Sequence, residues 1–171
     1  MATIRDLRRG DWPDVERIYE AGLATGVASF ETRVPTWEEW DARHLPEPRL
    51  VAELGTAVVG WLAISSTSSR ECYSGVVEHS VYVDETARGQ GIGRSLLERF
   101  VAAAPSRKIW TIQTSIISSN AASLALHAAV GFRTVGVRER IAARDGRWQD
   151  AVLLELRLPS LLDTSGTDTG V

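Results

Sequence analysis

The stretch from Ser80 to Arg94 constrains the fold of this chain more than any other part. An apolar strand ends at Val83, a short polar turn follows, and Arg88-Gly89-Gln90-Gly91-Ile92-Gly93-Arg94 leads directly into a segment with apolar residues at helical spacing. The unpaired amides and the positive dipole at a helix start favour an anion, and glycine leaves no side chain to hold a bulky phosphate away. The stretch therefore predicts a strand, a loop and a helix that bind a pyrophosphate-bearing ligand.

Two familiar glycine-rich motifs do not fit the spacing. A Walker loop has four residues between its glycines and a Lys before Ser or Thr, whereas Arg94-Ser95 stands at that place here. A dinucleotide fingerprint needs a third glycine where Arg94 lies and an acidic residue about twenty positions later. Residues 109–115 contain no Asp or Glu. Another type of pyrophosphate loop and a purely structural turn remain as alternatives.

Composition limits the classes of protein to which this chain can belong. The chain has 171 residues, 44% of them hydrophobic and 24% charged, which predicts one domain over 1–158 and a disordered polar tail over 159–171. A net charge of −3 gives no reason to expect nucleic acid or a membrane surface as a partner. One cysteine and three histidines without ligand spacing predict neither a disulfide nor a metal site. No apolar run follows the first charges, so a cytoplasmic protein is expected.

Apolar periodicity and turn signals predict the element order β-α-α-β-β-β-α-β-α-β-β. Asp11 and Thr36 are expected to cap the first two helices. This order indicates an α/β fold of the α+β type, in which helices flank a mixed sheet. The expected strands are 2–7, 49–54, 57–65, 75–83, 108–116, 132–141 and 151–158, and the expected helices are 12–24, the segment between Thr36 and Pro46, 91–104 and 119–131.

Glu78 stands in the strand that precedes the glycine stretch. Successive residues of a strand point to opposite faces, so Glu78, Ser80 and Tyr82 are expected to share one face. Because an isolated buried charge is costly, the Glu78 carboxylate must lie in a solvated cleft or form an ion pair. It is therefore either a general base that deprotonates an ammonium group or a structural partner of Arg138 or Arg140.

Four more residues near this strand have two interpretations each. His127, near the end of a mostly apolar predicted helix, is either a core residue or a proton donor to a leaving thiolate. The N–H groups of Val81 and Val83 would hold a thioester carbonyl if their strand splays from the next one, and would otherwise make ordinary sheet pairs. Asn120 is either a helix cap or a ligand for the arm of a cofactor.

The motif Arg-x-x-Gly-x-Gly between a strand and a helix resembles the coenzyme A pyrophosphate loop of the Gcn5-related N-acetyltransferase (GNAT) family. Four separated segments resemble its phosphinothricin and methionine sulfoximine N-acetyltransferase subgroup, and Phe30-Glu31 and the region around Trp37 and Trp40 also fit. The resemblance reaches to Leu158 and implies a mixed, mostly antiparallel sheet flanked by helices. The four segments are Val77–Val83, Ser119–His127, Gly131-Phe132 and Asp145–Asp150.

The resemblance implies direct transfer of an acetyl group from acetyl-CoA, without a metal, to the α-amino group of a small amino acid or analogue. The implied acceptors are of the phosphinothricin, methionine sulfoximine or methionine sulfone type. Glu78 would be the catalytic base and His127, where the family commonly has a tyrosine, the acid. The cofactor would be bound by Val81, Tyr82, Val83, Arg88, Gly89, Gln90, Gly91, Ile92, Gly93, Arg94 and Asn120.

The segment before the Glu78 strand departs from the subgroup, which has an aromatic and arginine-containing substrate loop there. Phe30 and Glu31, together with Arg70 and Tyr73 of this segment, are the candidate substrate residues. Arg70 would pair with a substrate carboxylate, and an exposed loop without a substrate role is the alternative for Arg70 and Tyr73. Cys72, in the same segment, is a weak candidate nucleophile because no base is evident near it.

The identity of the acceptor is therefore open. Aminoglycosides, polyamines and protein N-termini are alternative acceptors, and a non-catalytic acyl-CoA-binding module is an alternative function. The sequence also leaves a homodimer open, because Trp110 and Trp148 fit either a dimer interface or core packing.

Overall fold

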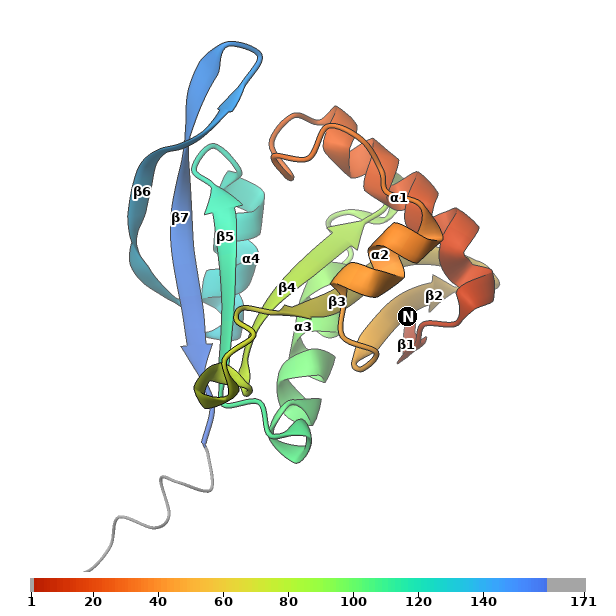
Figure 1. Cartoon of the computed structure of the whole chain (residues 1–171). Helices are drawn as coiled ribbons and strands as arrows, with labels where there is room; N and C mark the ends of the chain where they lie inside the picture. Colours follow the sequence, from red (N-terminus) through yellow and green to blue (C-terminus); the bar gives the residue numbers. More distant parts are fainter. Residues whose placement is uncertain (1, 160–171) are drawn as a thin grey trace, which may run out of the picture.

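A computed structural model of the chain describes residues 2–159, and within them the fold is one seven-stranded sheet with helices on both faces (Figure 1). The strand order is β1-β2-β3-β4-β5-β7-β6, and only β4 and β5 pair in parallel. This confirms the predicted mixed, mostly antiparallel sheet. The strands are β1 (Thr3–Asp6), β2 (Arg49–Leu54), β3 (Ala57–Ser66), β4 (Val76–Val83), β5 (Thr111–Ile117), β6 (Arg133–Arg144) and β7 (Arg147–Arg157), and the helices are α1 (Trp12–Ala24), α2 (Trp37–Arg43), α3 (Ile92–Ala103) and α4 (Ala121–Val130).

Local sequence explains most element ends. The Thr36 hydroxyl accepts a hydrogen bond from the Glu39 amide, and the Glu39 carboxylate accepts one from the Thr36 amide, which starts α2 with a capping box. Asp11 is the N-cap residue of α1, as predicted, but its side chain makes no capping hydrogen bond to the helix. Its carboxylate accepts instead from the Arg5 guanidinium, at 2.8 and 2.9 Å, and from the Arg8 amide. The strong bidentate pair with Arg5 outcompetes the weaker cap.

The final hairpin is longer than the sequence suggested. Asp145 and Gly146 both have positive φ, at 51° and 71°, which is the backbone of a two-residue turn that matches the twist of the flanking strands. The strands β6 and β7 consequently run up to this turn rather than ending before it. The predicted disordered tail falls on residues 160–171, apart from Pro159, and these lie outside the described residues.

Each face of the sheet has its own core. Helices α1 and α2 cover one face over Trp40, Trp61 and their neighbours, and α3 and α4 cover the other over Leu62, Phe100 and theirs (Figure 1). Strand β3 is buried on both faces because its alternate side chains enter the two cores. Truncating a fully buried tryptophan or phenylalanine typically lowers the free energy of unfolding by about 3–5 kcal/mol. These two cores therefore hold β4, which pairs with β3 between them, firmly in position.

The parallel pair β4–β5 is the irregular part of the sheet. The strands pair only from Val76–Glu78 to Thr111–Gln113, and the remaining residues of β4 have no ladder partner on β5. The two strands diverge beyond Glu78 and leave an open edge in the middle of the sheet (Figure 1). This opening is the main consequence of the fold for function.

None of the helices found between residues 2 and 159 is long and apolar enough to cross a membrane.

Candidate active site

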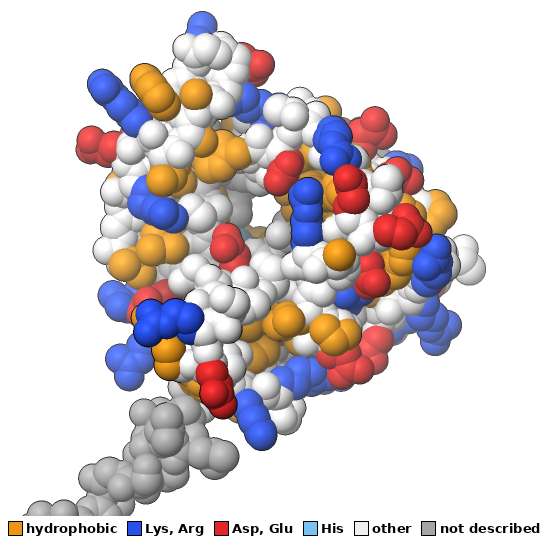
Figure 2. All heavy atoms as spheres, viewed as in Figure 1, with side chains coloured by type: hydrophobic (Ala, Val, Ile, Leu, Met, Phe, Trp, Pro, Cys, Tyr) orange, Lys and Arg blue, Asp and Glu red, His pale blue; other side chains and the backbone are white. Residues whose placement is uncertain are grey.

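Two cavities meet at the open edge of β4. We call the first the glycine groove, which has a volume of about 530 Å³ and lies beside the loop before α3. We call the second the central cavity, which has a volume of about 480 Å³ and lies between β4, β5 and β6. The space-filling view is hollowed at its centre, between the β5–β7 side and the α1–α2 side (Figure 2). Both cavities are lined by Ala28, Val81, Tyr82, Asn120 and Ser123.

Two different structural requirements explain why the three positions in the groove are glycine. Gly89 and Gly91 have φ of 75° and 77°, and a Cβ built on either would meet no atom within 4 Å, so their backbone faces open space. Gly91 is the N-cap of α3, where unpaired amides accumulate. Gly93 instead allows α4 to approach, since its Cβ would lie 3.0 Å from Leu126 Cδ2. A loop with two open glycines at a helix start suits a pyrophosphate.

Most of the predicted cofactor residues line this groove. They are Val81, Tyr82, Val83, Arg88, Gly89, Gly91, Ile92, Gly93, Arg94 and Asn120. Gln90 does not, because its side chain turns back and donates a hydrogen bond to the Thr86 carbonyl at 3.3 Å. Any contact that Gln90 makes with a ligand in the groove would therefore have to come from its backbone.

The backbone of β4 presents N–H groups to the opening. The Asp84 amide donates to the Val59 carbonyl on β3 at 2.8 Å. Amides along a strand alternate between its two edges, so those of Val81 and Val83 point to the opposite edge, where pairing with β5 has stopped. Free amides at this position can hold a carbonyl oxygen and stabilise negative charge that develops on it.

Tyr82 forms the wall between the two cavities. Its ring stacks on Trp61 and packs against Tyr19, with centroids 4.8 Å away in both cases. Gly22 of α1 makes room for this ring, because a Cβ at that position would lie 2.6 Å from Tyr82 Cδ1. Burial raises the pKa of the Tyr82 hydroxyl, so the residue stays neutral and acts through its shape.

Asn120 holds the start of α4 against the loop after α1. Its Oδ1 accepts from the Ser123 amide at 3.1 Å, and its Nδ2 donates to the Val27 carbonyl at 3.1 Å. The cap expected from the sequence is therefore present. The same side chain lines both cavities, so its position at the junction is compatible with the second interpretation as well.

Glu78 lies in the central cavity, at the last position where β4 still pairs with β5. Burial raises the pKa of its carboxyl group, and the positive charge of Arg138 partly offsets this rise. In the part of the chain that the structure describes, neither Arg138 nor Arg140 forms an ion pair with Glu78. A half-buried carboxylate with a raised pKa and access to a cavity can take a proton from a bound ammonium group.

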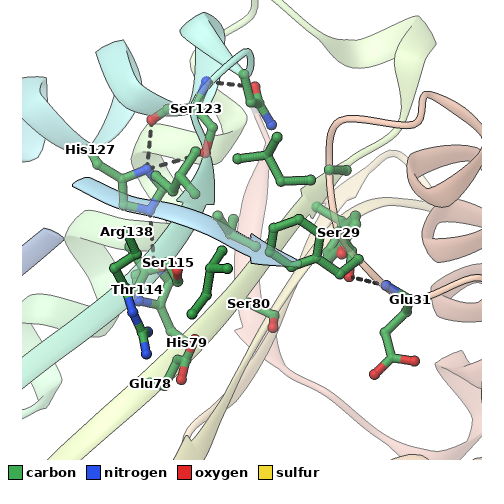
Figure 3. A pocket seen from close by; sticks show the side chains of 18 residues that line it. Ser29, Glu31, Glu78, His79, Ser80, Thr114, Ser115, Ser123, His127 and Arg138 are labelled. Atoms are coloured by element: carbon green, nitrogen blue, oxygen red, sulfur yellow. Dashed lines mark hydrogen bonds between the residues drawn. The ribbon is translucent and has the colours of Figure 1, made fainter. Parts of the chain in front are cut away.

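His127 of α4 is paired with His79, the residue after Glu78. The two Nε2 atoms lie 2.9 Å apart, and His127 Nδ1 lies 2.7 Å from the Ser123 carbonyl oxygen (Figure 3). A carbonyl oxygen only accepts, so His127 Nδ1 carries a hydrogen, its Nε2 carries the lone pair, and His79 Nε2 donates to it.

Burial lowers the pKa of both rings, to about 3 for His79, where the neighbouring His127 adds to the effect. The pair is therefore neutral at pH 7. His127 is thus an almost fully buried residue that also lines the central cavity, and its role as a proton donor stays a prediction.

The structure does not bring all predicted substrate residues together. Phe30 and Glu31 line the central cavity, whereas Arg70 and Tyr73 line neither cavity, and the Arg70 guanidinium lies 5.4 Å from the Tyr73 ring. Cys72 is exposed in the same loop. Over residues 2–159 no group of three His, Cys, Asp or Glu side chains is placed to hold a metal.

Sequence reasoning did not assign several polar residues of the central cavity to the site, among them His79, Thr114, Ser123 and Arg138. The alternation along β4 placed His79 opposite Glu78, and only the opening of the sheet lets both reach one cavity. A signal for Arg138 was present, because it was named as a partner of Glu78, but nothing in the sequence located its side chain in a cavity.

A splayed parallel strand pair with backbone amides on its open edge, beside a glycine loop at a helix start, can bind a carbonyl oxygen and a pyrophosphate of one ligand next to a second cavity. The model of the Acetyltransferase (GNAT) family matches residues 2–132. The chain therefore belongs to the GNAT acetyltransferase family, and it is an acetyl-CoA-dependent N-acetyltransferase.

Curated relatives and solved structures agree with this assignment. The chain is 37% identical over 161 residues to phosphinothricin N-acetyltransferase from Alcaligenes faecalis, covering 90% of this chain and 81% of that protein. It is 31% identical over 163 residues to the L-methionine sulfoximine/L-methionine sulfone acetyltransferase of Pseudomonas aeruginosa, covering 92% and 95%. A phosphinothricin acetyltransferase from Sinorhizobium meliloti, solved with acetyl-CoA, has a TM-score of 0.83 at 29% identity, covering 99% of this chain and 92% of that one.

Proposed function

We propose that the protein transfers an acetyl group from acetyl-CoA to the α-amino group of a small amino acid or analogue of the phosphinothricin, methionine sulfoximine or methionine sulfone type. The observation that carries this proposal is the position of Glu78. Its carboxylate lines the central cavity, while three residues further along β4, at Val81, the strand becomes the shared wall with the glycine groove. An amine beside Glu78 would therefore face a thioester at Val81.

In the proposed reaction Glu78 takes a proton from the acceptor ammonium, directly or through a water molecule. The free amine nitrogen attacks the thioester carbonyl carbon, the new C–N bond forms, and the C–S bond breaks to release the thiolate. The nitrogen loses its second proton as it becomes the amide, this proton neutralises the thiolate, and Glu78 releases the first proton to solvent. The amides of Val81 and Val83 bind the carbonyl oxygen while it carries negative charge. The Arg88–Arg94 loop binds the pyrophosphate and fixes the thioester in position.

We assign His127 as the proton donor to the thiolate, with one condition that its pairing imposes. The neutral ring carries its only hydrogen on Nδ1, and its Nε2 already accepts the hydrogen of His79 Nε2. His127 therefore gives up its Nδ1 hydrogen only as His79 passes its Nε2 hydrogen to His127 and takes up, at its own Nδ1, the proton that the amine nitrogen loses. The Ser123 hydroxyl oxygen lies 3.4 Å from His127 Nδ1 and lines both cavities, which makes it the natural path toward the sulfur. Because a thiol with a pKa near 8.5 is a good leaving group, release of the thiolate needs less acid catalysis than deprotonation of the ammonium group needs base catalysis.

The direct test is release of free CoA on incubation with acetyl-CoA and methionine sulfone, methionine sulfoximine or phosphinothricin. The same assay run on an aminoglycoside, a polyamine and a peptide N-terminus separates the alternative acceptors. Acetylation of those amines in preference to the amino acids would contradict the proposal. Calorimetric binding of acetyl-CoA without turnover on any amine would instead identify a non-catalytic acyl-CoA-binding module.

We further propose that residues 1–158 carry the activity as one domain and that the protein is cytoplasmic. We also propose that it forms a homodimer through β6 and β7. Val135, Val137 and Trp148 on these strands are 46%, 58% and 64% exposed, and β6 is at the end of the sheet. Trp110, by contrast, packs on Gly75 and is accounted for by the core. Light scattering of the wild type and of Val137→Glu tests the interface, since a monomeric wild type would contradict it.

A further inference from the structure

Strand β6 contains a bulge beside the central cavity. After an earlier register shift between Thr134 and Gly136, its pairing with β7 continues to Arg138 opposite Ala151 and resumes with Ala142 opposite Gln149, so three residues of β6 face one residue of β7 at this second irregularity. Within the bulge Arg140 has a φ of 49°, and its amide donates to the Asp150 carboxylate at 2.8 Å. Bulges of this kind redirect side chains, and they are common next to active sites.

The bulge brings two side chains into the cavity that a regular strand would separate. Residues three apart on a strand point to opposite faces, yet Arg138 and Ile141 both line the central cavity. Figure 3 shows the Arg138 side chain reaching toward Glu78, and the guanidinium is close enough to lower the pKa of the Glu78 carboxyl group. Arg138 is therefore held at the mouth of the cavity by local backbone geometry.

The charges around the cavity are complementary to a zwitterion. Arg138 is the only Arg or Lys that lines it, and the carboxylates there are Glu78 and Glu31. Glu31 already has a partner, since its carboxylate lies 3.7 Å from the Arg43 guanidinium. Among residues 2–159 Arg138 has no ion pair and no side-chain hydrogen bond, unlike Arg133 at the start of the same strand, which pairs with Glu155. Its five donors are thus available to an anion in the cavity.

We propose that Arg138 binds the α-carboxylate of the acceptor while Glu78 receives the proton of its α-ammonium group. This deepens the proposed function and rests on it. The guanidinium fork suits a carboxylate, and because the two charged groups line one cavity, an α-amino acid satisfies both. A polyamine or an aminoglycoside, which carries no carboxylate, leaves Arg138 without a partner. The inference replaces Arg70, which lines neither cavity, as the carboxylate anchor.

The experiment compares two acceptors that differ only in the carboxylate: L-methionine sulfone and its decarboxylated amine, 3-(methylsulfonyl)propylamine. The quantity measured is the ratio of their kcat/KM values. Hydrogen bonds to charged groups are worth enough that Arg138→Gln should reduce this ratio about 10- to 100-fold, mainly through KM of the amino acid, with Arg138→Lys in between. The matched control Arg133→Gln, on the same strand and outside the cavity, should keep the wild-type ratio.

Two results would overturn the inference. One is an unchanged ratio in Arg138→Gln, and if both acceptors then lose activity equally, Arg138 has a structural role. The other is a collapse of the ratio in Arg70→Gln alone. Calorimetric binding of methionine sulfone in the presence of CoA separates this inference from the proposed function. If methionine sulfone binds the wild type but not Arg138→Gln, and the wild type transfers no acetyl group, the carboxylate site is supported and the proposed function is contradicted.

Discussion

The glycine groove and the central cavity are built in opposite ways. The groove comes mainly from one continuous stretch, the end of β4 and the loop into α3, and its key atoms are backbone amides. The cavity collects side chains from the loop after α1, from β4, β5 and β6, and from α4. A ligand common to all members of a family needs only the first kind of site, whereas a particular acceptor needs the second. The difference predicts that mutations will separate cofactor binding from acceptor chemistry.

The strongest test of this separation is Glu78→Gln. Loss of a general base typically lowers the rate by about 10²- to 10⁴-fold, and we expect that loss in kcat/KM for methionine sulfone. The dissociation constant of acetyl-CoA should stay within about twofold, since the glycine groove does not include Glu78. Steady-state kinetics and calorimetry measure the two quantities, with exposed Glu71→Gln as the control. Full activity in Glu78→Gln would remove Glu78 as the base.

A second test concerns the histidine pair beneath the central cavity. His79→Leu leaves the buried lone pair of His127 Nε2 without a donor, which should lower the free energy of unfolding by about 1–3 kcal/mol. His79→Gln can still donate from its amide nitrogen and should lose less. Urea denaturation measures both variants. Equal stability of the Leu and Gln variants would show that the hydrogen bond is unimportant.

The pair also predicts a pH dependence of stability. Because both pKa values are lowered on folding, the unfolded state binds more protons below pH 6.5, and stability falls as the pH drops from 6.5 toward about 3. One titrating site contributes up to about 1.4 kcal/mol per pH unit. His79→Gln removes one of the two sites, so its unfolding free energy should fall less steeply between pH 6.5 and 5. A parallel decline in wild type and variant would contradict the assigned protonation states.

A third test acts on the glycine groove alone. Gly91→Ala places a side chain at a φ of 77°, which costs about 1–2 kcal/mol of backbone strain, and we expect about a tenfold weaker affinity for acetyl-CoA. KM for the acceptor should change little. Gly93→Ala is the matched comparison, because its Cβ would lie 3.0 Å from the flexible end of Leu126 and 3.5 Å from Val83 Cγ2, and φ there is not positive. A larger loss of affinity in Gly93→Ala would mean that helix packing, rather than the open loop, determines binding.

The smallest predicted effect is a shift in the pH profile of acceptor chemistry. Burial raises the pKa of Glu78, so kcat/KM for the acceptor should fall on the acid side with a midpoint above 4.5, as the base becomes protonated. Arg138 lowers that pKa, so Arg138→Gln should move the midpoint to higher pH. Ionisation of the acceptor amine affects variant and wild type equally, so the difference between their two midpoints reports the change in the pKa of Glu78. An unchanged or lowered midpoint would show that Arg138 does not act on Glu78.

Much of this molecule could be predicted from its sequence, for reasons that differ between its parts. Helix α1 was predicted with its observed bounds, and the β2–β3 hairpin to within one residue, because apolar periodicity and turn residues are local signals. Asp11 was placed correctly at the N-cap of α1, but its carboxylate pairs with Arg5 instead of capping the helix, because a partner on another element is not visible in a local pattern. The β6 bulge was also missed, since it depends on pairing with Asp150 across the hairpin.

The sequence by itself determined the family, the fold and the loop of the glycine groove, because the backbone of a continuous stretch is specified by its own glycines. Only the tertiary structure decided the central cavity. Arg70 is close to Glu78 in the sequence and lies outside the cavity, whereas Arg138 is sixty residues away and lines it. The splay of β4 from β5 and the bulge of β6 determine which side chains meet there. Both are outcomes of strand pairing, which no single segment specifies alone.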